Sequence, residues 1–187
     1  TTPDSFSDGG EFNTVTAAIA QARKMIAAGA DIIDIGGQST RPGAETISLA
    51  EELERTIPVI QALRQECGVP ISIDTTRSQV AEAALQAGAD VINDISGGTF
   101  DPQILALAAQ TQAPIILMHL RGTPQTMQQL TDYQDLIGEM RDFFTQQTKL
   151  AQQQGVLPRQ MMLDPGIGFA KTAAQNLTLL RQLSAFK

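Results

Sequence analysis

The sequence predicts an α/β fold of the TIM (β/α)8 barrel class, incomplete in this chain because about five of the eight strands fall within its 187 residues. Two observations predict this fold. Short apolar runs of strand length alternate with segments of helical periodicity, as in repeated βα units around a parallel sheet. Each apolar run also ends in polar residues, and the carboxyl ends of the strands are where such a barrel carries its active site.

The expected strands are too short and too continuously apolar for amphipathic helices, and they cover 31–35, 70–73, 91–95, 114–118 and 161–163. Helical periodicity covers 14–28, 49–66, 78–87, 102–109, 131–154 and 174–183. The joints "AAGADIIDIGG" and "QAGADVINDISGG" nearly repeat each other, and Gly29 and Gly88 stand where a helix stops before a strand. A doubly wound sheet is the alternative, but no strand end shows the G-x-G-x-x-G spacing of a Rossmann-type sheet.

Three strand-end residues form the central candidate site. Asp74, Asn93 and Asp164 each end a different expected strand, so in a barrel their side chains can converge on one planar ligand that is rich in N–H donors. The alternative is that each residue only caps the helix that follows it. Three such residues at three strand ends favour the ligand site.

Two further loops are candidates. Thr40 and Arg41 follow the first strand, where Pro42 and Gly43 restrict the backbone, and an Arg fork with a neighbouring hydroxyl suits a carboxylate or a phosphate. The alternative for Arg41 is a solvated surface position. The N-terminal string "TPDSFSDGG" resembles a mobile lid, although an ordinary Asp/Gly turn would look the same.

Some residues suggest chemistry less strongly. His119 is the only histidine, and without a matching nucleophile signature we interpret it as structural rather than as a catalytic base. Cys67 is the only cysteine, so it forms no internal disulfide, and we interpret it as core filler in a reducing compartment. Paired His or Cys spacings are missing from the sequence, so any divalent ion is expected to be Mg²⁺ held by oxygen atoms and phosphate.

Composition limits the class of protein. The net charge is −7, which disfavours nucleic-acid binding, and any anion must be bound locally. No run approaches the ~18 apolar residues of a membrane-spanning helix. The first residues carry no signal-peptide pattern, so the expected location is cytoplasmic, with no membrane partner.

Several motifs then resemble one family. The strings "TPDSFSDGG", "DIIDIGGQSTRPGA", "ISIDTTRSQVAEAALQAGADVINDISGG", "ILMHLRGTPQTMQ" and "LDPGIGFAK" resemble, in order and spacing, the signatures of the dihydropteroate synthase family. The resemblance implies a TIM barrel that joins 6-hydroxymethyl-7,8-dihydropterin diphosphate to p-aminobenzoate with release of diphosphate, in folate biosynthesis and with Mg²⁺ present. It also implies inhibition by sulfonamides and a possible homodimer.

The resemblance assigns roles to residues of this chain. It implies that Asp74, Asn93 and Asp164 bind the pterin ring, that Met118 packs near that ring, and that Thr40 touches the diphosphate. A second group is implied to act at the p-aminobenzoate end or on the reacting carbon. In it Arg41 and Pro42 shape the subsite with Phe6 from the lid, and Asp8 stabilises the cation left by the departing diphosphate.

The same resemblance implies that residues 1–187 are one pterin-binding barrel domain truncated at both ends. The family's metal-binding Asn is expected before Thr1, so no metal ligand is assigned in this chain, and the Lys and Arg-x-His positions of the last two βα units are expected after Lys187. We therefore expect the 187-residue chain alone to be inactive. Alternatives are a methyltetrahydrofolate methyltransferase-type domain, a non-catalytic pterin-binding paralogue, or one arm of a multifunctional folate enzyme.

Overall fold

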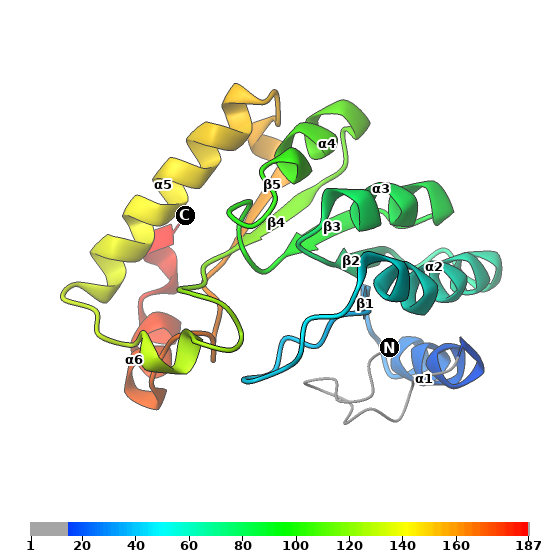
Figure 1. Cartoon of the computed structure of the whole chain (residues 1–187), viewed down its shortest axis with the longest axis horizontal. Coiled ribbons are helices and arrows are strands. Elements are labelled where there is room, and N and C mark those ends of the chain that lie inside the picture. The colour runs from blue at the N-terminus through cyan, green and yellow to red at the C-terminus, as the bar shows by residue number, and fades with distance from the viewer. Residues whose placement is uncertain (1–14, 187) are drawn as a thin grey trace.

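A computed structural model describes residues 15–186, and its centre is a five-stranded parallel sheet (Figure 1). The strands lie side by side in chain order, β1-β2-β3-β4-β5, and every neighbouring pair is parallel. Their bounds are β1 Ile33–Gly36, β2 Ile71–Asp74, β3 Val91–Asp94, β4 Ile115–Met118 and β5 Met161–Asp164. All five predicted strands are therefore present.

The α-helices are α1 Val15–Ala27, α2 Leu49–Glu66, α3 Ser78–Ala87, α4 Gln103–Thr111, α5 Leu136–Gln153 and α6 Ala173–Arg181. Helices α2 to α5 occupy the connections between the strands, whereas α1 precedes β1 and α6 follows β5. Because the strands follow chain order and parallel crossovers are right-handed, the connecting helices all fall on one side of the sheet. A doubly wound sheet would reverse its strand order and carry helices on both sides. The structure is thus an incomplete (β/α)8 barrel, as predicted.

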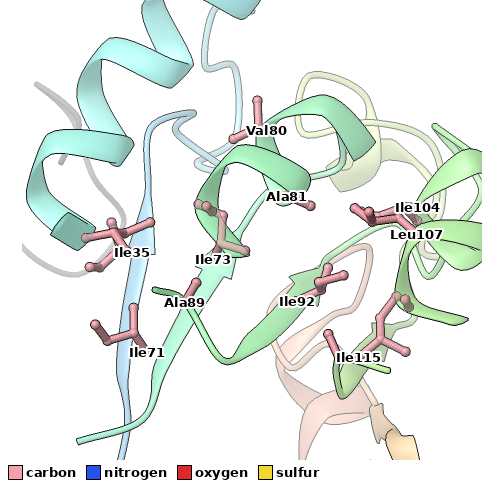
Figure 2. Packing of buried hydrophobic residues seen from close by; sticks show 14 of the residues in the cluster. Ile35, Ile71, Ile73, Val80, Ala81, Ala89, Ile92, Ile104, Leu107 and Ile115 are labelled. Atoms are coloured by element: carbon pink, nitrogen blue, oxygen red, sulfur yellow. The ribbon is translucent and has the colours of Figure 1, made fainter. Parts of the chain in front are cut away.

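The main core lies between the sheet and these helices (Figure 2). Alternate strand residues supply this core, among them Ile35, Ile73, Ile92 and Ile115. The last three are fully buried. Burying one such side chain contributes about 1.5–3 kcal/mol to folding. The intervening strand positions must therefore face the opposite, inner side of the sheet.

Local signals explain where the helices end, and one predicted start was wrong. Gly88 ends α3 with φ of 113°, a left-handed conformation that glycine adopts at little cost, as predicted. The helix predicted over 131–154 begins only at Leu136. The Asp135 carboxylate accepts a hydrogen bond from the Gly138 N–H at 3.0 Å and caps the first turn, so the residues before it form a loop.

Three short 3-10 helices complete the structure and were not predicted: η1 Met127–Gln129, η2 Pro158–Gln160 and η3 Leu183–Phe186. Within residues 15–186, none of the helices combines the length and the apolar composition that a membrane crossing requires.

Candidate functional site

The inner side of the sheet collects four of the candidate residues. Asp74, Asn93, Met118 and Asp164 each follow a strand residue that packs toward the helices, so all four point away from the helix layer. Asp74 is the register partner of Asn93 on the next strand, and Met118 is the partner of Asp164. The three polar members are half-buried, whereas Met118 is buried among apolar neighbours.

A fifth inner-side residue, Asp34, joins this group and was not assigned as a site residue from the sequence. The Asn93 Nδ2 group donates to both carboxylate oxygens of Asp34, at 3.3 and 3.2 Å, and the Ser72 hydroxyl donates to the same carboxylate. The available signal was the alternation Ile-Asp-Ile in β1, which places an acid on the face opposite two core isoleucines.

Burial and neighbouring charge shift both carboxylates on this face. The Asp34 side chain keeps some solvent-accessible surface, but the protein atoms around it raise the pKa of its carboxyl group. The hydrogen bonds from Ser72 and Asn93 oppose that rise. Burial raises the pKa of Asp74 well above its usual range, and the nearby negative charges of Asp34, Asp94 and Glu52 add to the effect. Shifts of this kind are typical of sites that bind or react.

A pocket of about 240 Å³ opens at the carboxyl ends of the strands. Asp74 and Thr40 lie on its wall together, and its apolar part includes Ile95, Phe100 and Pro124. Such a mixture of apolar surface and a few polar groups is typical of small-molecule sites. Thr40 and Asp74 therefore line the same pocket.

Glu52 and Arg77 also line this pocket, and neither was predicted as a site residue. Arg77 Nη1 donates to Glu52 Oε2 at 2.9 Å, and the Thr75 hydroxyl donates to Glu52 Oε1 at 2.6 Å. The Glu52 side chain is almost fully buried, whereas that of Arg77 is 28% exposed. This ion pair joins α2 to the loop after β2.

Arg41 and Pro42 line a different depression, of about 530 Å³, within the loop after β1. The tip of that loop crosses to the loop after β4, where the Gly43 N–H donates to the Pro124 carbonyl at 3.2 Å and the Gln125 side chain donates to the Ala44 carbonyl. The loop thus spans the carboxyl ends of the intervening strands. Arg41 does not line the pocket that holds Asp74.

The loop after β5 is built around Asp164 and His119. The Gly166 N–H donates to Asp164 Oδ1 at 2.8 Å, and the His119 N–H donates to the Asp164 carbonyl at 3.0 Å. Lys171 is buried and donates to Nδ1 and the carbonyl of His119, at 3.1 and 3.3 Å, and to the Phe169 carbonyl at 2.8 Å. These contacts fix the backbone that carries the Asp164 carboxylate.

His119 has a structural environment. Its ring lies edge-on to Phe143 with centroids 4.9 Å apart, and burial with the positive charges of Lys171 and Arg121 lowers its pKa to about 3. Burial also lowers the pKa of Lys171 to about 8, against the opposing effect of Asp164. A neutral imidazole that accepts from Lys171 agrees with the interpretation of His119 as structural.

Two candidates, Phe6 and Asp8, lie outside the described residues. Among residues 15–186, His, Cys, Asp and Glu side chains form no group of three or more that could hold a metal ion. Cys67 packs at the edge of the main core, with its thiol 3.6 Å from the Leu63 carbonyl.

The arrangement can now be compared with known proteins. Residues 1–187 match the model of a family described as pterin binding enzymes. This chain belongs to that family. A dihydropteroate synthase of Synechocystis is 74% identical to this member over 187 residues, which are 100% of this chain and 65% of that protein.

Solved structures agree with the family assignment. The Yersinia pestis dihydropteroate synthase with a sulfonamide drug complex superposes on this pterin-binding chain with a TM-score of 0.94 at 44% identity, over 98% of this chain and 66% of that one. The Xanthomonas albilineans dihydropteroate synthase in complex with 7,8-dihydropteroate gives a TM-score of 0.83 at 37% identity, over 99% and 64%. The chain therefore spans about two thirds of the length of these proteins.

Proposed function

We propose that the protein carrying this chain is a dihydropteroate synthase. It would condense 6-hydroxymethyl-7,8-dihydropterin diphosphate with p-aminobenzoate to form 7,8-dihydropteroate and diphosphate. The observation that carries the proposal is the set of polar side chains on the inner side of β2, β3 and β5, one of which, Asp74, lines a pocket at the strand ends. The relatives named dihydropteroate synthase, and the ligands in their structures, support the same substrate class.

In this proposal Asp74, Asn93 and Asp164 bind the pterin ring. A pterin presents several N–H donors along one flat edge, and two carboxylates with one amide oxygen supply the matching acceptors. The raised pKa of Asp74 fits this role, since a carboxylate that is crowded by protein atoms and by like charges gains when a ligand brings donors to it. Met118 would contact the ring from the buried side.

The loop after β1 would serve the other two parts of the reaction. Thr40, on the wall of the Asp74 pocket, is proposed to donate to the diphosphate. Arg41 and Pro42, which line the other depression, are proposed to shape the p-aminobenzoate subsite, because the planar Arg41 guanidinium suits the carboxylate of that substrate. The predictions that Phe6 completes this subsite and that Asp8 stabilises positive charge belong to the same proposal.

The chemistry is a substitution at the methylene carbon next to the pterin ring. The carbon–oxygen bond to the diphosphate breaks, and the electron pair leaves with the diphosphate. The amine nitrogen of p-aminobenzoate then forms the new carbon–nitrogen bond and loses a proton. A cationic methylene between these steps is stabilised by the electron-rich pterin and by the carboxylates of its pocket, so a covalent bond to the enzyme is not required.

Magnesium remains a prediction. The side chains of residues 15–186 offer no cluster that fits a divalent ion, so no step is assigned to one from them. The homodimer and the cytoplasmic location also remain predictions.

The test is turnover by the full-length protein. Purified enzyme with both substrates should form 7,8-dihydropteroate and an equal amount of diphosphate, and a sulfonamide should compete with p-aminobenzoate. The 187-residue chain alone is expected to show no useful turnover. If the full-length protein binds a pterin but never forms the carbon–nitrogen bond, it is a binding paralogue and the proposal is wrong.

A further inference from the structure

Asp34 is hydrogen-bonded to Asn93, one of the residues proposed to bind the pterin. It lies on β1, whereas Asn93 lies on β3, so the Asn93 side chain reaches across the inner side of β2 to meet it. Both carboxylate oxygens of Asp34 accept from the same Asn93 nitrogen, at 3.3 and 3.2 Å. The Ser72 hydroxyl of β2 donates to Oδ1 and holds the carboxylate from the strand between them.

These contacts fix which way the Asn93 amide points. An amide can turn its oxygen or its nitrogen toward a neighbour, but an ionised carboxylate only accepts hydrogen bonds. The nitrogen of Asn93 must therefore face Asp34, and its oxygen must face away. Within the described part of the chain no donor occupies Asn93 Oδ1. Burial raises the pKa of Asp34, and the hydrogen bonds from Ser72 and Asn93 act against that rise by favouring the ionised form.

We propose that Asp34 is a positioning residue that orients the Asn93 amide, so that Asn93 Oδ1 accepts from the donor edge of the pterin. The inference rests on the proposed function and adds a source of ligand specificity to it. An Asn93 that was free to rotate would offer an acceptor or a donor with similar ease. It would then tolerate ring systems whose edge carries an oxygen in place of the amino group.

The alternative is that Asp34 only stabilises the fold. If Asp34 has only a structural role, its replacement would disorder the inner side of the sheet and weaken the binding of every ligand equally. An orienting role would instead change the preference between two ligands of the same shape. The two roles therefore differ in a ratio of affinities rather than in a single affinity.

The experiment compares two ligands on the full-length protein. Calorimetric titration would measure the Kd of a pterin and of the matched 2,4-dioxopteridine, which carries an oxygen in place of the exocyclic amino group. Asp34→Asn keeps the shape of the side chain but lets residue 34 either donate to or accept from Asn93. Ser72→Ala is the matched control, since it removes the other donor to Asp34 and leaves the contact with Asn93 in place.

The expected results are specific. Asp34→Asn should weaken pterin binding about tenfold, the loss of one well-oriented hydrogen bond, while 2,4-dioxopteridine binding changes no more than about twofold. Ser72→Ala should leave the ratio of the two Kd values within about twofold of the wild-type ratio. Equal losses for both ligands in Asp34→Asn, an unchanged ratio, or the same change of ratio in Ser72→Ala would overturn the inference.

The proposed function is judged separately by the wild type. A wild-type protein that binds the pterin without turnover contradicts the synthase activity, and the ratio in Asp34→Asn still decides the role of Asp34. A wild-type protein that binds no pterin contradicts both.

Discussion

Lys171 donates a hydrogen bond to Nδ1 of His119 at 3.1 Å, and both side chains are buried. A buried ammonium is costly unless its donors are used, and here the other donors meet the carbonyls of His119 and Phe169. The pair ties the loop after β5 to the end of β4. It thereby fixes the position of Asp164, whose own carbonyl accepts from the His119 N–H.

Acid should destabilise the protein through His119. Its pKa is about 3 in the folded state against 6.5 for a free imidazole, so its contribution to stability is complete above pH 6.5 and is lost as the pH falls toward 3. Replacing His119→Asn keeps a neutral acceptor in the ring's place. Relative to this variant, the wild-type free energy of unfolding should fall by about 2 kcal/mol between pH 6.5 and 4.5. Chemical denaturation at several pH values measures the difference, and parallel curves would refute the assignment.

Lys171 should change stability in the same direction as His119, but in the alkaline range. Its pKa is about 8 when folded and 10.5 when free, so the unfolded chain takes up a proton between these values and stability rises with pH there. The difference in free energy of unfolding between the wild type and Lys171→Met should therefore change by about 2 kcal/mol in favour of the wild type between pH 8 and 10. Lys149→Met, at an exposed position of α5, is the control and should show no such trend.

Gly166 should tolerate no side chain. Its φ is 66°, and a Cβ there would lie 2.3 Å from the His119 carbonyl oxygen. Gly166→Ala should cost about 3 kcal/mol or more of stability and should weaken pterin binding, because the Gly166 N–H holds the Asp164 carboxylate. Gly29→Ala has a similar positive φ of 96° but open space around it, and should cost only about 1 kcal/mol. Thermal unfolding of both variants compares the two costs, and equal costs would contradict the close approach.

The buried ion pair between Glu52 and Arg77 should matter more than its exposed neighbour. Glu52→Ala removes the acceptor of Arg77 Nη1 and of the Thr75 hydroxyl and should cost about 3 kcal/mol. Glu51→Ala removes the partner of Arg55 on the outer surface of the same helix and should cost less than about 1 kcal/mol. Denaturant unfolding curves measure the two costs, and a similar cost for both variants would contradict the prediction.

The sequence alone predicted the strands, most of the helices and the barrel class, because apolar periodicity is a local signal. The helix from Leu49 to Glu66 has the predicted bounds. The start at Leu136 was missed because the prediction extended the helical pattern back over 131–135, whereas the cap at Asp135 decides where the helix begins.

The site was predictable at its strand ends and less so elsewhere. Asp74, Asn93 and Asp164 end their strands, so topology alone brings them to one side. Asp34 lies within a strand, and its partnership with Asn93 depends on the register of three strands, which one sequence does not reveal. The buried contact of Lys171 with His119 likewise depends on how two loops pack.

Calorimetric titration of a pterin into the full-length protein and its Asp74→Asn variant tests the central claim most directly. The carboxylate of Asp74 has a raised pKa, so its cost to stability is present above that pKa, and the neutral variant should be slightly more stable at pH 7. The same variant should bind the pterin more weakly by about 1.5–3 kcal/mol, whereas Asp31→Asn, at an exposed position before β1, should bind it normally. A stable Asp74→Asn protein with wild-type pterin affinity would contradict the placement of the pterin on the inner side of this sheet.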